Sequence, residues 1–127
     1  MNLNLHYRSA DNTVVVYCVG RITFGDEATL LSNQIAALLA ERQRVLLNLG
    51  GVDAVDAAGL GALAELAALA RTSGGEIRLC SLPEHVSSLL FLTHLSQMLQ
   101  VYDSEEEALA ARSRDYTELS DGLPGAA

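Results

Sequence analysis

The chain is 127 residues long and acidic, with a formal net charge of −8 at pH 7. Half of its residues are apolar and five per cent are aromatic, so we expect one domain with a core of Leu, Val and Ala. Its basic residues are all arginine and form none of the basic stretches that bind nucleic acids or anionic membrane surfaces. No apolar run is long enough to span a bilayer, and residues 1–10 lack a signal-peptide pattern. We therefore expect a cytoplasmic protein without membrane insertion.

The first part of the chain predicts a hairpin followed by a helix. Residues 3–7 alternate apolar and polar, which indicates an edge strand, and residues 13–19 are apolar on both faces, which indicates a central strand. Turn-forming residues at 9–12 join the two strands. A helix is expected over residues 25–41, with two acidic residues in its first turn, where the helix dipole favours negative charge. Its expected core-facing stripe consists of Leu31, Ile35, Leu38 and Arg42.

The centre of the chain predicts a buried strand followed by a loop. Residues 45–49 form a short apolar run, as expected for a strand that is covered on both faces. Gly50 and Gly51 are expected to end this strand. Asp53 and Asp56 then lie in the loop that leads to the next helix.

That next helix, expected over residues 57–72, has a first turn that is poor in side chains. Asp56 stands just before it, where its carboxylate can accept hydrogen bonds from free backbone N–H groups. Gly59 and Gly61 remove side chains from the first turns, so that another backbone can approach closely. We therefore expect a helix start that can be reached from outside, and we place the function there.

The remaining chain predicts a strand over residues 76–81, a helix over 84–92 that bends toward residue 99, and a short strand over 101–103. Ser104, with a glutamate three residues later, fits a capping box and starts a last helix to about residue 112. Residues 113–127 have no apolar period and are expected to form a mobile tail.

The expected order of elements is β-β-α-β-α-β-α-β-α, which defines an α/β domain over residues 1–112. Strands that are separated by helices need crossover connections, so the sheet is expected to be mixed, with parallel pairs and one antiparallel hairpin. We expect four to five strands and about four helices.

No arrangement of side chains predicts catalysis, a cofactor or a metal site. Residues 52–69 contain no Ser, Thr, Cys, His or Lys, so a catalytic site there would depend on carboxylates alone. Cys18 and Cys80 lie in strand-like segments and are expected to be buried thiols. The three histidines lack the spacing of a helical metal pair; they are His6, His85 and His94.

Two further patterns near the helix start have structural explanations. Gly59, Gly61 and Ala64 match the G-x-G-x-x-A form of the dinucleotide fingerprint, but the strand is expected to end too early for this motif. Asp53 and Asp56 are expected to be a turn residue and a helix cap, in preference to a pair of catalytic acids. We therefore predict neither a nucleotide site nor an enzyme.

Residues 47–63, LNLGGVDAVDAAGLGAL, resemble the central signature of STAS domains, the fold of anti-sigma-factor antagonists. The resemblance covers about residues 3–111. Four further segments carry the resemblance: residues 20–22 before the central signature, and residues 74–79, 90–95 and 101–109 after it.

The resemblance implies that the unmodified domain binds an anti-sigma factor that is itself a serine kinase, and that phosphorylation of a Ser or Thr after the motif aspartate breaks the complex. Asp56 matches the motif aspartate, and Gly59 and Leu60 match its Gly-Leu. The phosphoacceptor position falls on Ala57, which has no hydroxyl, and Ala58 offers none either. The usual phosphorylation switch is therefore expected to be missing.

Three explanations for Ala57 stay open. The domain is a permanently unmodified antagonist, or it is a scaffold subunit of a lipid-transport or signalling complex, where phosphorylation does not matter. In the third explanation, regulation acts elsewhere, through abundance, the tail, or another hydroxyl such as Thr72 or Ser73.

We predict a non-enzymatic binding module without a cofactor, whose partner is an anti-sigma factor or a related serine-kinase-type protein. The alternative is the scaffold subunit. In family members an aspartate often stands at the position of Thr23, near the end of the second strand. The predicted partner-binding residues are Asp53, Asp56, Ala57, Ala58, Gly59, Leu60, Gly61 and Thr23.

Overall fold

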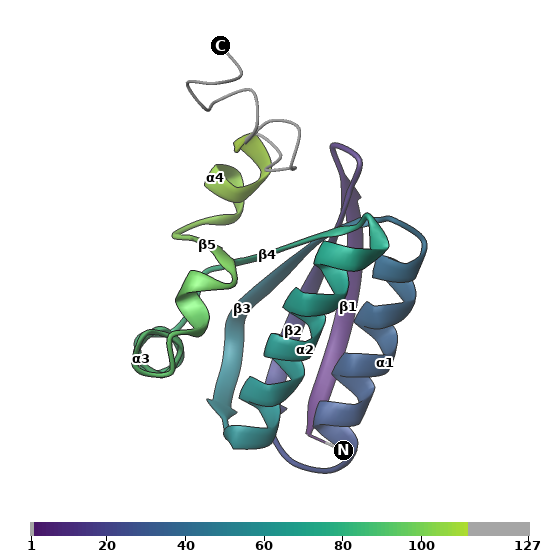
Figure 1. Ribbon diagram of the computed structural model, residues 1–127. Coiled ribbons are helices and arrows are strands. Elements are labelled where there is room, and N and C mark those ends of the chain that lie inside the picture. Colours follow the sequence, from purple (N-terminus) through teal and green to yellow (C-terminus); the bar gives the residue numbers. More distant parts are fainter. Residues whose placement is uncertain (1, 112–127) are drawn as a thin grey trace, which may run out of the picture.

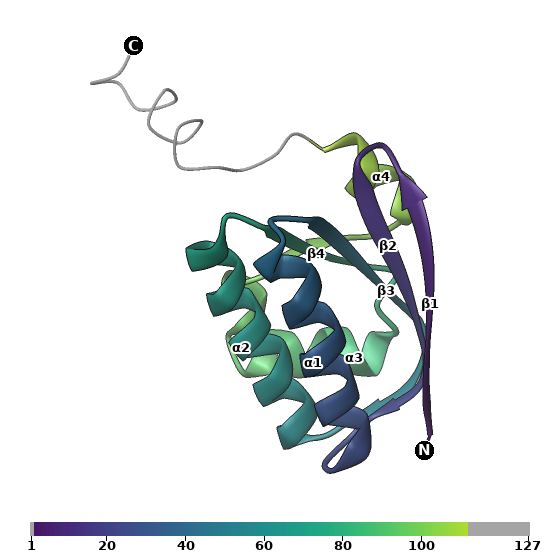
Figure 2. The ribbon, with the colours of Figure 1, turned by 90° about the vertical axis from the view of Figure 1, so that its right-hand side faces the viewer.

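The computed structural model describes residues 2–111, which form one five-stranded sheet with helices packed against it (Figures 1 and 2). The strands and α-helices follow the predicted order, and a short 3₁₀ helix, η1, is added before the last strand. The elements are β1 (Leu3–Ala10), β2 (Thr13–Ile22), α1 (Asp26–Ala40), β3 (Arg44–Val55), α2 (Ala57–Ser73), β4 (Glu76–Cys80), α3 (Glu84–Leu92), η1 (Leu95–Gln97), β5 (Gln100–Tyr102) and α4 (Glu105–Ala110).

The sheet is mixed, as predicted, and its strands lie in the order β1-β2-β3-β4-β5. β1 and β2 are antiparallel, and all other neighbouring pairs are parallel because helices connect them. The hairpin turn consists of Asp11 and Asn12, whose φ angles of 51° and 63° suit a two-residue hairpin turn. β1 is an edge strand and β2 is internal, as the sequence predicts.

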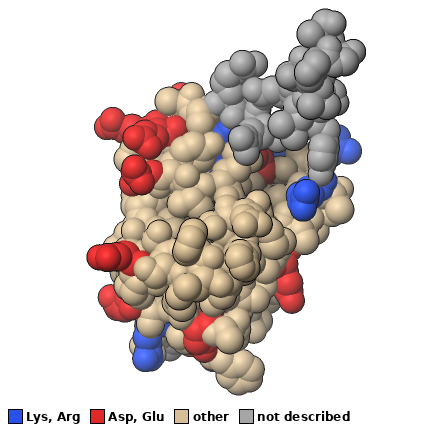
Figure 3. All heavy atoms as spheres, turned by 60° about the vertical axis from the view of Figure 1, so that its left-hand side comes forward, with Lys and Arg blue, Asp and Glu red and all other residues tan. Residues whose placement is uncertain are grey.

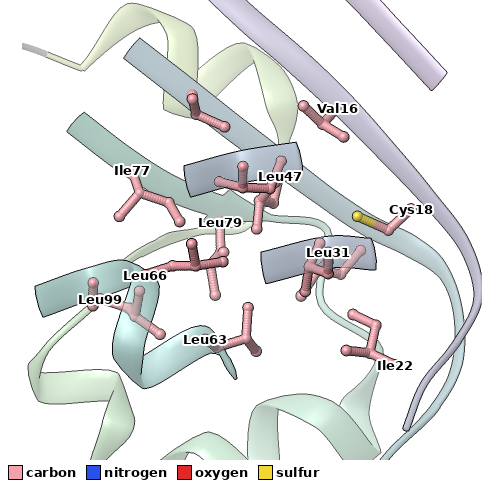
Figure 4. Close-up of a cluster of buried hydrophobic side chains, with 14 of the residues drawn as sticks. Val16, Cys18, Ile22, Leu31, Leu47, Leu63, Leu66, Ile77, Leu79 and Leu99 are labelled. Atoms are coloured by element: carbon pink, nitrogen blue, oxygen red, sulfur yellow. The ribbon is translucent and has the colours of Figure 1, made fainter. Parts of the chain in front are cut away.

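α1 and α2 lie side by side on one face of the sheet (Figure 1). Strand residues such as Val16 and Leu47 and helix residues such as Leu31 and Leu63 form the main core on this face (Figure 4). Val86 and Leu90 of α3 belong to the same core. This layer fixes the ends of β2 and β3 relative to the start of α2.

α4 covers part of the opposite face of the sheet. Its Ala108 is buried with Val15 and Leu46, two strand residues that point away from the main core. The Ser104 Oγ accepts a hydrogen bond from the backbone N–H of Glu107, with 3.1 Å between the two atoms. Ser104 is therefore the N-cap of α4, as predicted.

The central strand is longer than predicted. β3 runs from Arg44 to Val55, whereas the sequence pattern predicts a strand over residues 45–49 and a loop after it. Pairing with β4 does end at Asn48, but pairing with β2 continues to Val55 through two register shifts. The glycine pair is accommodated as an irregularity within the strand, because β2 still supplies backbone hydrogen bonds beyond it. Asp53 therefore lies in a strand, and the prediction of a loop residue is wrong.

The core-facing stripe of α1 also differs from the expected one. Leu31, Ile35 and Leu39 are buried, whereas Leu38 is only partly buried. Arg42 lies beyond the end of the helix, with a φ angle of 60°. The predicted end of the last helix near residue 112 and the predicted mobile tail over 113–127 lie outside the described residues.

Both cysteines are buried free thiols, as predicted. Cys18 lies on β2 in the main core and Cys80 on β4 in the cluster beneath α4, so β3 separates them and they lie on opposite faces of the sheet. Burial raises the pKa of Cys18 to about 12, so this thiol stays protonated at neutral pH. Among residues 2–111, no helix has the length and apolar character that crossing a membrane requires.

Candidate functional site

Asp56 joins three segments of the chain at the start of α2. It is the N-cap of the helix, and its Oδ1 accepts a hydrogen bond from the backbone N–H of Gly59 at 2.9 Å. Its Oδ2 accepts a second bond from the backbone N–H of Phe24, also at 2.9 Å. The backbone N–H of Asp56 donates in turn to the carbonyl of Ile22 at 3.4 Å. One aspartate thus holds the end of β3, the start of α2 and the loop between β2 and α1 together.

These bonds favour the charged form of the carboxyl. The hydrogen bond from the backbone N–H of Phe24 is the largest cause that holds the pKa of Asp56 below its ordinary value, and the bond from the backbone N–H of Gly59 is the second. Asp56 is therefore a carboxylate over the whole neutral range. The predicted role of Asp56 as a helix cap is confirmed, and the bond to Phe24 is an addition that the sequence pattern does not predict.

Phe24 is a prominent residue that sequence reasoning missed. Its side chain is 83% exposed, the highest value among the exposed large apolar side chains of the described residues. It stands in a two-residue segment between buried Ile22 and Gly25, the N-cap of α1, whose φ angle is 102°. The sequence does contain an indication that Phe24 is exposed. It is an aromatic residue in a short connection, directly before Gly25, which has no side chain that could cover the ring.

Thr23 lies in the loop between β2 and α1, next to Phe24, whose backbone N–H is bonded to Asp56. Its hydroxyl donates to Glu27 Oε1 at 3.2 Å, and its carbonyl accepts from the backbone N–H of Ala28 at 3.0 Å. Glu27 Oε2 also accepts from the backbone N–H of Asn2 at 3.1 Å, and this bond chiefly keeps the pKa of Glu27 low. Thr23 thus helps to order the start of α1, next to the predicted site.

The two glycines of α2 have different surroundings. A Cβ atom on Gly59 would lie 2.1 Å from the carbonyl oxygen of Ile22, whereas a Cβ on Gly61 would have nothing within 4 Å. Gly59 is buried, so its missing side chain serves the approach of β2 and not the approach of a partner. Gly61 is exposed, and only this glycine leaves the surface open as predicted.

The other predicted partner-binding residues differ in how far they are exposed. Ala57 and Asp53 are exposed, and Ala58 is partly exposed. Leu60 packs partly against the main core, so it offers only part of its side chain to a partner. We define a candidate docking surface, called the docking surface below, as the exposed parts of Phe24, Asp53, Asp56, Ala57 and Gly61.

The docking surface is acidic. The segments that meet at Asp56, residues 20–28 and 50–61, contain one basic residue, Arg21. Their carboxylates are Asp26, Glu27, Asp53 and Asp56. A partner that covers this surface gains from basic groups opposite the carboxylates.

The dinucleotide fingerprint has no structural basis, although one premise of that prediction is wrong. β3 ends at Val55, directly before the helix and not near residue 49. Gly59 and Gly61 nevertheless lie inside α2, whereas the fingerprint needs its glycines in the turn between strand and helix. Within residues 2–111, no three or more His, Cys, Asp or Glu side chains are grouped so that they could hold a metal ion.

The fold is a mixed α/β sheet with parallel crossovers, and comparisons with known proteins identify its family. A sequence model of the STAS domain matches residues 4–108. The chain belongs to the STAS domain family, and the resemblance seen in the sequence is confirmed.

Individual relatives agree with this assignment. One relative is BtrV of Bordetella bronchiseptica, which is named for a proposed role as an anti-sigma factor antagonist. It is 29% identical to this chain over 99 residues, which cover 77% of this chain and 85% of BtrV. The crystal structure of an anti-sigma factor antagonist from Mycobacterium paratuberculosis has a TM-score of 0.73 at 20% identity, covering 84% of this chain and 91% of that one. A further structure, from Thermotoga maritima, has a TM-score of 0.70 at 24% identity, covering 83% and 91%. The two structures have the same fold as this chain.

The two glycines of α2 provide a matched test of the geometry. We expect Gly59→Ala to destabilise the protein by about 1–3 kcal/mol, because the new Cβ collides with the Ile22 carbonyl. Gly61→Ala should instead stabilise it by about 0.5–1 kcal/mol, because alanine favours the helix and meets no neighbour. Thermal or denaturant unfolding of both variants checks this, and equal effects would contradict the described packing of α2 on β2.

The capping carboxylate gives a prediction about pH. Asparagine has one acceptor oxygen where aspartate has two, so Asp56→Asn should lower the melting temperature and speed hydrogen exchange of the Phe24 amide. The pKa of Asp56 is lower in the folded state, so its contribution is complete above the unfolded value near pH 3.9 and is lost as the pH falls below it. The difference in melting temperature between wild type and variant should therefore be constant at neutral pH and shrink below about pH 4.

Asp53→Asn is the control for this experiment. Its side chain is exposed and makes no hydrogen bond or ion pair within the described chain, so the substitution should leave the Phe24 amide unchanged. A gap between wild type and Asp56→Asn that stays the same at all pH values would contradict the assigned role of the carboxylate.

Proposed function

We propose that this chain is a non-enzymatic protein-binding module that acts as an anti-sigma factor antagonist. Its membership of the STAS family and the names of its relatives support this role. The proposed partner is an anti-sigma factor, and the role requires the chain to act in the cytoplasm. The proposed contact is the docking surface around Asp56.

The observation that carries the proposal is the ordered, side-chain-poor surface next to an exposed aromatic ring. Asp56 fixes the backbone of Phe24 through a hydrogen bond. Ala57 and Gly61 leave the adjacent start of α2 without large side chains. Large aromatic side chains contribute much of the binding energy in many protein interfaces. A loop that is already ordered loses little conformational entropy when it binds.

The chemistry of the surface also defines the partner's side of the contact. The two sequence segments that meet at Asp56, residues 20–28 and 50–61, contain four carboxylates, and Arg21 is the one cation among them. The partner should therefore present an apolar pocket for Phe24 with arginine or lysine side chains around it.

Ala57 gives the proposed antagonist its regulatory character. The family resemblance implies a phosphoacceptor at this position, and alanine has no oxygen to which a phosphoryl group could be transferred. The proposed module therefore binds its partner without being released by phosphorylation at the helix start. The scaffold-subunit alternative shares this surface and differs in the partner that occupies it.

Phe24 tests the contact itself. We expect Phe24→Ala to raise the dissociation constant for the anti-sigma factor by about tenfold or more, because the substitution removes the exposed anchor of the docking surface. Phe91→Ala is the matched control, since Phe91 is the other phenylalanine of the chain and is 72% exposed on α3. Titration calorimetry with the purified anti-sigma factor measures both. Equal losses in the two variants would contradict the assignment of the docking surface.

Position 57 tests the missing switch. With a kinase-type anti-sigma factor and ATP, the wild type should form a complex and acquire no phosphate, whereas Ala57→Ser should become phosphorylated and dissociate faster, because the phosphate adds negative charge and bulk at the contact. Intact-mass spectrometry and gel filtration provide the two measurements. Efficient phosphorylation of the wild type near the start of α2 would overturn the proposed loss of the switch. Binding only to subunits of a transport complex would support the scaffold alternative.

A further inference from the structure

The loop between β2 and α1, which carries Phe24, is held on two sides. On one side the Asp56 carboxylate accepts a hydrogen bond from the backbone N–H of Phe24 at 2.9 Å. On the other side lie Asn2, just before β1, and Glu27, in the first turn of α1. Figure 1 shows the N-terminal end of β1 and the start of α1 at the same end of the molecule.

Glu27 uses both oxygens of its carboxylate on this second side. Its Oε2 accepts from the backbone N–H of Asn2 at 3.1 Å, and its Oε1 accepts from the Thr23 hydroxyl at 3.2 Å. The carbonyl of Asn2 accepts in turn from the backbone N–H of Arg21 at 2.7 Å. Asn2 and Glu27 thus form what we call the N-terminal clamp, which holds the loop directly before Phe24.

The N-terminal clamp is attached to the core. Leu3, which follows Asn2, is only 3% exposed and pairs with Gly20 of β2. A Cβ atom on Gly20 would lie 2.0 Å from the carbonyl oxygen of Asn2, and the φ angle of Gly20 is 119°. The absence of a side chain at Gly20 therefore allows Asn2 to approach β2 closely.

The charge of Glu27 does not distinguish it from other residues, but its bonds do. The chain contains 16 acidic residues, and Figure 3 shows acidic side chains at several separate places on one face of the molecule. Asp26 precedes Glu27 in the same helical turn, is exposed, and makes no hydrogen bond or ion pair within the described chain. Only the second of these two neighbouring carboxylates holds the loop.

We propose that Glu27 is a positioning residue of the docking surface, which acts on the partner through Phe24 by holding the loop and not through its own charge. An aromatic ring on a fixed loop loses less conformational entropy on binding than a ring on a loose loop. This inference rests on the proposed function, because the affinity for the partner is the quantity that the N-terminal clamp changes.

Substitutions at position 27 separate reach from charge. Glu27→Ala removes both bonds and should raise the dissociation constant for the anti-sigma factor by about five- to tenfold. Glu27→Asp keeps the charge but shortens the side chain, so it should weaken binding similarly, and it replaces Glu27→Ala if that variant is not folded by circular dichroism. Glu27→Gln should stay within about threefold of the wild type, because its amide can accept from the Asn2 N–H and donate to the Thr23 hydroxyl.

Asp26→Ala is the matched control for titration calorimetry with the anti-sigma factor. It removes a carboxylate from the same turn without breaking a bond, so its dissociation constant should also stay within about threefold of the wild-type value. Equal losses in Glu27→Ala and Glu27→Gln would overturn the proposal, because the charge alone would then account for them. Equal losses in Glu27→Ala and Asp26→Ala would overturn it as well.

A double-mutant cycle with Phe24 tests the route of the effect. If Glu27 acts through the ring, adding Glu27→Ala to Phe24→Ala should raise the dissociation constant by less than about twofold further. Losses that simply add in the doubly substituted chain would overturn the proposal.

Amide hydrogen exchange of the free chain separates a failure of this inference from a failure of the proposed function. The backbone amides of Arg21 and Phe24 should exchange about fivefold faster or more in Glu27→Ala than in Asp26→Ala. This measurement needs no partner, so unchanged exchange would overturn the N-terminal clamp whichever protein binds the docking surface. Faster exchange with an unchanged dissociation constant would overturn the positioning role and leave the proposed antagonist function intact.

Discussion

The arrangement of the proposed site depends on one carboxylate with two backbone donors. Asp56 is bonded to Gly59, three residues ahead, and to Phe24, which is thirty-two residues away in the sequence. The first bond caps α2 and the second holds the loop between β2 and α1. Because both oxygens of the same group are used, the exposed ring of Phe24 and the open start of α2 keep a fixed relation. The docking surface is thus built from two segments that meet at a single side chain.

Local patterns in the sequence predicted much of this fold. The N-cap at Asp56, the N-cap at Ser104 and the order of strands and helices follow from residues that are close together in the chain. The full length of β3 could not be predicted in this way. Gly50 and Gly51 resemble a strand end locally, but β2 extends the strand by pairing with it up to Val55. The bond between Asp56 and Phe24 was missed for the same reason, because it depends on how distant segments pack.

Gly59 and Gly61 show how far the same residue type can differ in its role. In the sequence both glycines open the first turns of α2. In the structure the carbonyl of Ile22 fills the space at Gly59, while the space at Gly61 stays empty. Gly59 is therefore required for packing the helix on β2, and Gly61 contributes to the surface. Only the position of β2 behind the helix distinguishes the two, and a pattern within residues 57–63 does not contain that information.

The loss of the hydroxyl at position 57 changes what can control the proposed complex. A phosphorylated serine would oppose binding directly, by adding up to two negative charges where the partner sits. With alanine there, occupancy of the partner depends on concentrations and affinities alone, by mass action. The acidic docking surface should bind a basic partner more weakly as the salt concentration rises, because salt screens the attraction between opposite charges. Ionic strength would thus change the occupancy of the proposed complex even though no residue is modified.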